Sequence, residues 1–156
     1  MFRAVPQLLL AIAALSPALA RAADEIFIDG FQETFINEIV NDSVDGDAVE
    51  FFNKTTAAVD FSGWYFTDDD PQHVYTFPSG SVLTAGAYIV IQGVDLPFGL
   101  GSADSVYLYS SDSSLHDRYV WQSSATSPGS HSRCPNGTGA FTIAAASSLG
   151  STNVCP

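Results

Sequence analysis

The amino-acid sequence predicts an all-β fold, a sandwich or a barrel of short strands. Apolar segments after residue 22 are short and recur roughly every ten residues. They are rich in Val, Ile, Phe, Tyr and Trp, which fit a pleated, half-buried surface. Clusters of Gly, Pro, Asp, Asn and Ser separate these segments and predict turns. No window with helical periodicity outside the first 22 residues is long enough to compete, which argues against a helical fold.

Residues 1–22 are expected to be a secretory signal peptide. Arg3 supplies a positive charge, and the apolar run at residues 8–15 is too short to span a bilayer. Pro17 ends this run, and mostly small residues follow it at residues 18–23. We expect cleavage after Ala22. The alternative, a retained membrane anchor, fits this length and these flanking residues less well. No other apolar run approaches a membrane span, so the sequence predicts a secreted or periplasmic protein.

The mature chain is expected to contain three parts. Residues 23–33 form a linker with a turn signal at Asp29 and Gly30, and residues 34–143 form the sandwich. The small, polar residues 144–156 form an irregular tail. The segments expected to be strands combine β-branched and aromatic residues, and they are residues 34–40, 48–53, 63–67, 73–78, 87–92, 105–110 and 117–122.

The 2 cysteines, Cys134 and Cys155, predict one disulfide in an exported chain. It would close a loop of about 20 residues and stabilise the fold by roughly 3 kcal/mol in the chain-entropy model. Structural zinc needs four ligands, and two thiols without nearby histidines make a poor zinc site. The disulfide is therefore expected to hold the C-terminal tail against the domain.

The charge of the chain argues against a nucleic-acid partner. The sequence has 5 basic and 17 acidic residues and a formal net charge of −12. Removal of the signal peptide would take away two of the basic residues, Arg3 and Arg21, and would lower the charge from −12 to −14. Binding to a phosphate backbone needs Lys and Arg side chains that displace counterions.

Three consecutive aspartates, Asp68, Asp69 and Asp70, precede Pro71 and lie close to His73. Asp-Pro favours the start of a turn, and proline fixes one of its dihedral angles. Calcium needs oxygen ligands that converge, whereas consecutive residues of an extended segment point to alternate sides. We therefore expect a solvated hairpin turn here, with no metal.

A second acidic cluster, at residues 41–50, does not match the EF-hand pattern. The residues before Gly46 do not match the ligand positions of that pattern, and Phe52 stands where its ligating glutamate should be. No metal or other cofactor is expected. The alternative that stays open is a calcium site of another type, built jointly by the two clusters from Asp42, Asp45, Asp47, Asp68, Asp69 and Asp70.

Nothing in the sequence predicts catalysis. His73, His116 and His131 are available as bases, but no G-x-S-x-G nucleophile motif accompanies them. The G-x-G at residues 99–101 lacks the third glycine of a dinucleotide site. We therefore expect no catalytic residue and no enzyme.

Six segments, in this order and spacing, resemble the lamin tail domain family. They are FINEIV, GDAVEFFN, DFSGWYFTDD, HVYTFPSGSVLTAGAYIVI, FGLGSADSVYLYSSDSSLHD and SHSRCPNGTGAF. The family is an immunoglobulin-like β-sandwich found in nuclear lamins and in exported bacterial proteins. The resemblance covers about residues 34–141 and departs from the family at Ala48, where a tryptophan is common.

The resemblance implies structural roles for several polar and aromatic residues. Trp64 is expected to be the buried aromatic residue of the sandwich, and Arg133 is expected to form an ion pair or to cap carbonyl groups. Side chains that are expected to hold loops and strand ends by hydrogen bonds to the backbone are Asn37, Glu38, Glu50 and Asn53.

The resemblance also implies a function. It suggests a non-enzymatic exported module that binds a protein or a cell-surface component, or that serves as a surface scaffold. The alternative is a carbohydrate- or calcium-dependent binding module. Its aromatic platform would be drawn from Tyr107, Tyr109, Tyr119 and Trp121.

Overall fold

The computed structural model describes residues 35–41, 46–125 and 128–156. The expected signal peptide at residues 1–22, the linker at residues 23–33, and Asp42 and Asp45 lie outside the described residues. In the described ranges there is no helix that is both long and apolar enough to cross a membrane.

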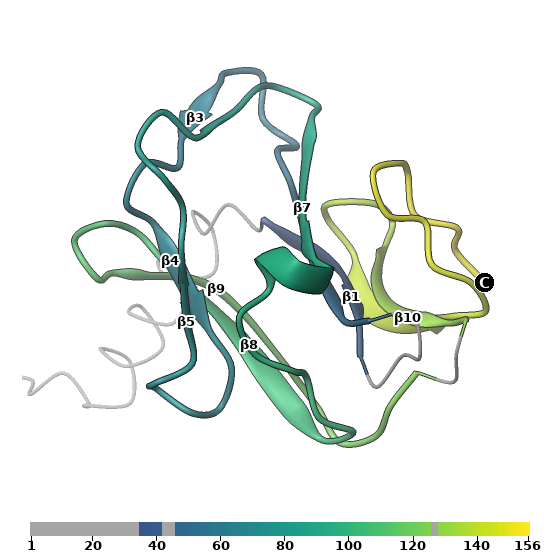
Figure 1. The fold of residues 1–156 in the computed structure, drawn as a ribbon. Helices are drawn as coiled ribbons and strands as arrows, with labels where there is room; N and C mark the ends of the chain where they lie inside the picture. The colour runs from purple at the N-terminus through teal and green to yellow at the C-terminus, as the bar shows by residue number, and fades with distance from the viewer. Residues whose placement is uncertain (1–34, 42–45, 126–127) are drawn as a thin grey trace, which may run out of the picture. The chain divides into compact units, whose positions relative to one another are not determined.

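The described chain consists of strands joined by turns (Figure 1). The elements are β1 (Ile36–Val40), β2 (Ala48–Phe52), β3 (Val59–Asp60), β4 (Tyr65–Thr67), β5 (Val74–Thr76), β6 (Val82–Leu83), β7 (Tyr88–Gln92), the 3-10 helix η1 (Gly93–Asp95), β8 (Asp104–Tyr109), β9 (Leu115–Trp121), β10 (Ser130–Cys134) and β11 (Ala140–Ala144). Five of the seven segments expected to be strands contain one of these strands. The other two, residues 105–110 and 117–122, overlap β8 and β9, which begin one and two residues earlier.

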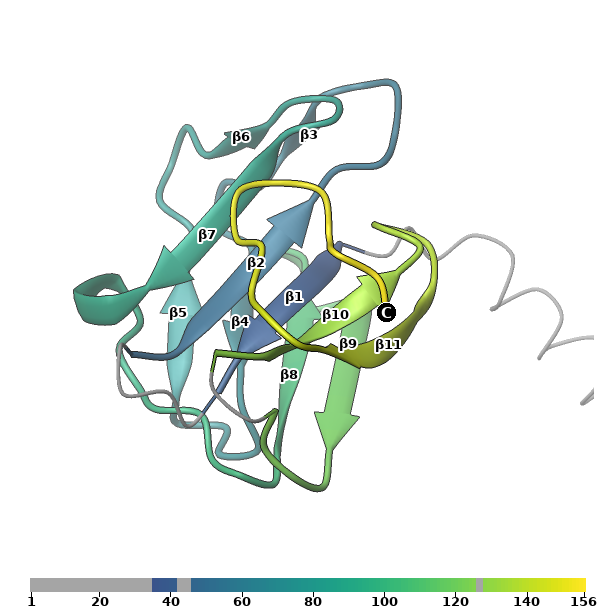
Figure 2. The ribbon, with the colours of Figure 1, turned by 90° about the vertical axis from the view of Figure 1, so that its right-hand side faces the viewer.

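The strands form two antiparallel sheets and a short ribbon. One sheet has the order β11-β10-β1-β2-β7, the other has the order β5-β4-β8-β9, and β3 pairs with β6. Figure 2 shows the five-stranded sheet in front of the four-stranded one. The prediction of an all-β, immunoglobulin-like sandwich is confirmed.

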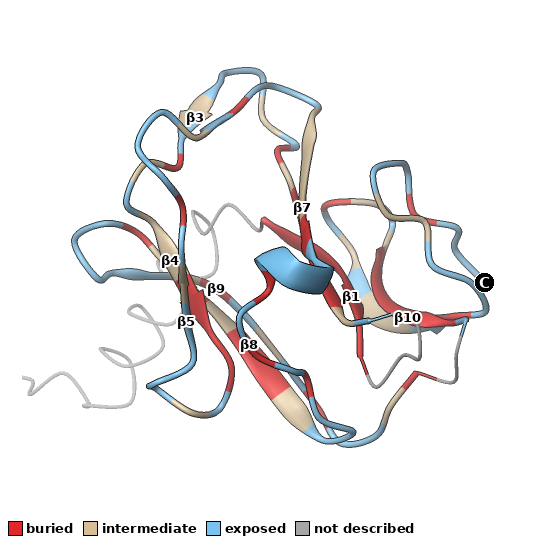
Figure 3. Ribbon diagram, viewed as in Figure 1, coloured by how far each residue is buried: buried red, intermediate tan, exposed pale blue. Residues whose placement is uncertain are grey.

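Phenylalanine side chains from both sheets fill the space between them. Phe51 on β2 lies 5.3 Å, between ring centroids, from Phe66 on β4 and from Phe77. Val106 and Leu108 are fully buried on the inner side of β8. Figure 3 shows that buried residues concentrate on β1, β10 and the middle of β8. Burial of these large apolar side chains is the main source of stability.

The expectation that Trp64 is the buried aromatic residue is wrong. Trp64 is half-buried at the edge of the core, with its ring 4.5 Å from Phe61 and 4.4 Å from His116. Gly63 precedes it with a φ of +73°, in a turn that ends just before β4. Trp64 therefore covers one end of the core, while Phe51, Phe61 and Phe66 are fully buried.

The C-terminal segment packs against the outer face of the five-stranded sheet. A disulfide joins Cys134 on β10 to Cys155, as the sequence predicted. Figure 2 shows the last residues crossing β1 and β2. Ser148 N donates to Glu38 Oε1 at 2.8 Å, and Gly150 N donates to Glu50 Oε2. The tail therefore has a defined path, which specific polar contacts hold.

Candidate functional site

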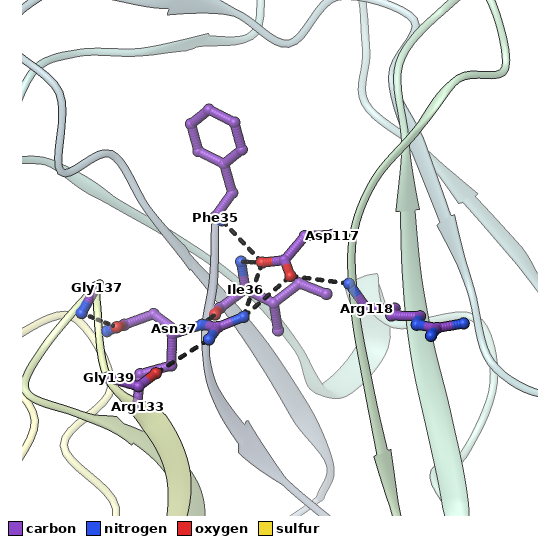
Figure 4. Close-up of polar contacts among 8 residues, drawn as sticks. All are labelled: Phe35, Ile36, Asn37, Asp117, Arg118, Arg133, Gly137 and Gly139. Atoms are coloured by element: carbon purple, nitrogen blue, oxygen red, sulfur yellow. Dashed lines mark hydrogen bonds and ion pairs between the residues drawn. The ribbon is translucent and has the colours of Figure 1, made fainter. Parts of the chain in front are cut away.

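Arg133 connects parts of the fold that are far apart in the sequence (Figure 4). Its Nη2 donates to Asp117 Oδ1 at 2.9 Å, so that β10 of one sheet is tied to β9 of the other. Its Nε donates to the carbonyl oxygen of Ile36 at 2.6 Å, and Nη1 donates to that of Gly139 at 3.0 Å. The guanidinium carbon lies 4.5 Å from the ring centre of Phe141. These contacts make Arg133 a structural residue.

Asp117 is the acceptor at the centre of this network. Its Oδ2 accepts hydrogen bonds from the backbone N–H groups of Phe35 and Ile36, each at 2.9 Å. Its Oδ1 accepts one from Arg118 N at 2.8 Å. Both Asp117 and Arg133 are buried. Asp117 carries no signal in the sequence, because only the sandwich brings it next to Arg133.

Two glutamates face each other across β1 and β2 beneath the C-terminal tail. Glu38 and Glu50 are cross-strand partners, and both are fully buried. Glu50 Oε1 accepts a hydrogen bond from Asn37 Nδ2 at 2.7 Å. Burial raises the pKa of Glu50 from 4.5 to about 7, although the hydrogen bonds from Asn37 and Gly150 lower it. Glu50 therefore has a structural role that depends on the tail above it.

The three histidines occupy separate environments. His73 Nδ1 lies 2.7 Å from Asp68 Oδ2, while the ring of His116 packs against Trp64. His131 is buried, with its Nδ1 3.1 Å from the hydroxyl of Tyr119. Each histidine ring thus contacts a different side chain, and the three rings belong to three separate sets of contacts.

The aspartate turn is only partly the solvated turn that the sequence predicts. It does connect β4 to β5, and Asp69 is exposed. Asp68, however, is buried. Its Oδ1 accepts a hydrogen bond from Asp70 N at 2.8 Å, and its Oδ2 contacts His73. Asp70 in turn accepts from Gln72 N at 2.9 Å.

The structure assembles an acidic group that differs from the candidate metal ligands. Asp47 is not part of this group, and its Oδ2 accepts a hydrogen bond from Leu100 N at 2.6 Å. Asp68 and Asp69 instead meet Asp104 at the start of β8, a residue that the sequence analysis did not consider. The expected strand at residues 105–110 begins one residue after Asp104, so the sequence carried no signal for its role.

The outer side of the four-stranded sheet carries a surface that we call the tyrosine face. Two rows of paired residues cross its strands. The first row is Val74, Thr67, Tyr107 and Arg118, and the second is Thr76, Tyr65, Tyr109 and Leu115. Val120 lies on the same side of β9, and it is 48% exposed.

The four aromatic residues considered as a platform do not form one surface. Tyr107 and Tyr109 lie on the tyrosine face, but Trp121 is buried and donates from Nε1 to the carbonyl oxygen of Gly101 at 3.0 Å. Tyr119 stacks on Phe141, with ring centroids 3.8 Å apart. Successive side chains of β9 alternate in direction, which sends Tyr119 and Trp121 to the inner side.

Comparison with known proteins identifies the family. A family model described as Lamin Tail Domain matches residues 31–123, which is more than half of the chain. The match stops before β10, whereas the resemblance in the sequence extended to about residue 141. Neither a curated protein nor a solved structure matches the chain. The chain therefore belongs to the lamin tail domain family.

Proposed function

We propose that this chain is an exported, non-catalytic module that binds a protein partner at the cell surface or in the medium through its tyrosine face. The composition of that face is the observation that carries the proposal. The chain has 17 acidic residues, yet neither row of the face contains a carboxylate. Arg118 is the one charged side chain in the two rows, all of which lie in described strands.

The exposed side chains of the face are of the kind that protein interfaces use. Val74 is 41% exposed and Leu115 is 38% exposed, and they lie at opposite ends of the two rows. Tyrosine adds a large contact area at a low cost in conformational entropy. A contiguous face of tyrosine, threonine and aliphatic side chains with one arginine fits a partner surface that offers apolar side chains and an acceptor for Arg118.

The geometry of the rings favours a protein over a saccharide. Tyr65 and Tyr109 are stacked on each other, with ring centroids 5.0 Å apart and planes 15° from parallel. Neighbouring rings in this arrangement cover one face of each other. A sugar platform needs an open ring face, whereas a protein partner can also pack against ring edges.

Two observations support a location outside the cytoplasm. The disulfide between Cys134 and Cys155 is of a kind that persists in oxidising compartments. Residues 1–22 have the sequence pattern of a secretory signal peptide. The strongly acidic charge supports a partner other than nucleic acid.

The test is affinity capture from the envelope and medium of the source, with the secreted mature chain as bait. A partner should bind the wild type and should be lost with Tyr109→Ala and with Val74→Asp. Val94→Asp is the matched control, because Val94 is fully exposed on η1, outside the face. The affinities of the purified partner for all four proteins then decide the question. Equal binding by all four, or a soluble saccharide that competes for the face, would contradict the proposal.

A further inference from the structure

Three carboxylates from two separate segments converge at one end of the four-stranded sheet. Asp68 and Asp69 follow β4, and Asp104 begins β8. Each offers one oxygen, and the three oxygens lie within 4.8 Å of one another. Asp69 N also donates to Asp104 Oδ1 at 3.3 Å, which fixes the turn against β8. Carboxylate oxygens this close together repel each other.

A buried hydroxyl next to these carboxylates has no hydrogen-bond partner. Ser105 is only 2% exposed, and its Oγ is unsatisfied. Ser105 follows Asp104 directly, and its backbone N–H donates to Asp104 Oδ1 at 2.7 Å. Ser105, Asp69 and Asp104 line one pocket of about 290 Å³. Leaving such a hydroxyl unpaired costs stability, so a ligand for its oxygen would be favourable.

We propose that Asp68, Asp69 and Asp104 bind a divalent cation of the calcium type beside this pocket, with the Ser105 hydroxyl as a further oxygen ligand. Calcium accepts six to eight oxygen ligands in irregular geometry, and water would supply the remainder. Magnesium requires a near-ideal octahedron, and zinc prefers nitrogen and sulfur ligands.

Contacts around the carboxylates already orient two of them. His73 Nδ1 contacts Asp68 Oδ2 at 2.7 Å, and Gly101 N donates to Asp104 Oδ2 at 2.7 Å. Oxygens that accept from neighbouring groups in this way retain lone pairs for a cation. The bound ion would neutralise the repulsion between Asp69 and Asp104 and would fasten the β4–β5 turn to β8.

Terbium luminescence and thermal unfolding of the mature chain test the site. Tb³⁺ substitutes for Ca²⁺ at oxygen sites, and Tyr107 and Trp121, which line the same pocket, can sensitise it. We expect a saturable signal that Ca²⁺ displaces, with a Kd of about 0.1–1 mM, the range of extracellular calcium modules. About 10 mM Ca²⁺ at constant ionic strength should raise the Tm by about 5 °C.

Three variants locate the effect. Asp69→Asn should weaken Ca²⁺ binding at least about tenfold, since it removes one of three carboxylates. This variant should melt no lower than the wild type in EDTA, because it relieves a repulsion. Ser105→Ala should weaken binding less, and Asp95→Asn, which also removes an exposed charge, on η1, should not change it.

An unchanged Tm at this Ca²⁺ concentration would overturn the proposal. So would equal responses of Asp69→Asn and Asp95→Asn, which would indicate a diffuse counterion atmosphere. Both readouts use the metal alone, so the result is independent of whether the tyrosine face binds a protein.

Discussion

Replacing Asp117 with asparagine tests the central ion pair most directly. Asp117 Oδ1 and Oδ2 accept from three backbone N–H groups and from Arg133, and the residue is 7% exposed. Asparagine offers one oxygen and places an NH₂ group where the other oxygen was. In one orientation the NH₂ group faces the N–H groups of Phe35 and Ile36, and in the other it faces Arg133 and Arg118 N.

The expected cost follows from these contacts. The substitution leaves the buried guanidinium of Arg133 without a counter-charge, and at least two donors lose their acceptor. Breaking a buried ion pair from one side costs about 3–5 kcal/mol. For a domain of this size, 1 kcal/mol corresponds to roughly 3–5 °C, so the Tm should fall by about 10–20 °C.

Urea unfolding, followed by tryptophan fluorescence with the disulfide intact, gives the free energy of unfolding. Asp112→Asn is the control, since Asp112 is exposed in the β8–β9 turn and accepts only local hydrogen bonds. It should cost less than about 1 kcal/mol. Arg133→Met and the double variant complete a double-mutant cycle, with a coupling energy above about 1.5 kcal/mol expected. A loss below 1 kcal/mol for Asp117→Asn, or additive effects in the cycle, would refute the reasoning.

Three further outcomes are expected. Folding raises the pKa of Glu50 from 4.5 to about 7. Between these pH values the folded state keeps a proton on Glu50 that the unfolded state has released. The protonated Glu50 therefore contributes its full stabilisation below pH 4.5, and that stabilisation is lost as the pH rises through 7. Glu50→Gln should remove the part of the pH dependence of the unfolding free energy that Glu50 causes. The difference between this variant and the wild type separates the effect of Glu50 from that of His131, whose lowered pKa makes stability rise with pH instead. Reduction of the Cys134–Cys155 disulfide should cost roughly 3 kcal/mol and leave the far-UV circular dichroism spectrum unchanged, because most of the core lies before Cys134; loss of the β-sheet spectrum would contradict this. Duplex DNA should show no mobility shift at low salt, where electrostatic binding is strongest, and a shift that salt abolishes would reveal a basic surface.

Local patterns in the sequence predicted an all-β fold and the positions of most strands, and the family resemblance narrowed this to an immunoglobulin-like sandwich. Side-chain alternation and turn formers act over a few residues, so residues 48–53 and 87–92 could be assigned to strands without any tertiary information. Four strands lie outside the expected segments. The pair of β3 and β6 is too short to have a detectable periodicity. The segments of β10 and β11 entered the sequence analysis only through the family resemblance, which covers residues 130–141. The disulfide followed from the number of cysteines and the expected compartment.

The candidate sites depend on contacts that only the tertiary structure decided. Asp104 meets Asp69 from 35 residues away, and Arg133 meets Asp117 through the packing of one sheet on the other. The alternation of β8 was visible in the sequence, but the side that faces solvent depends on which side the second sheet covers. Phenylalanines, and not Trp64, occupy the centre of the core, because the strand register decides which side chains point into it.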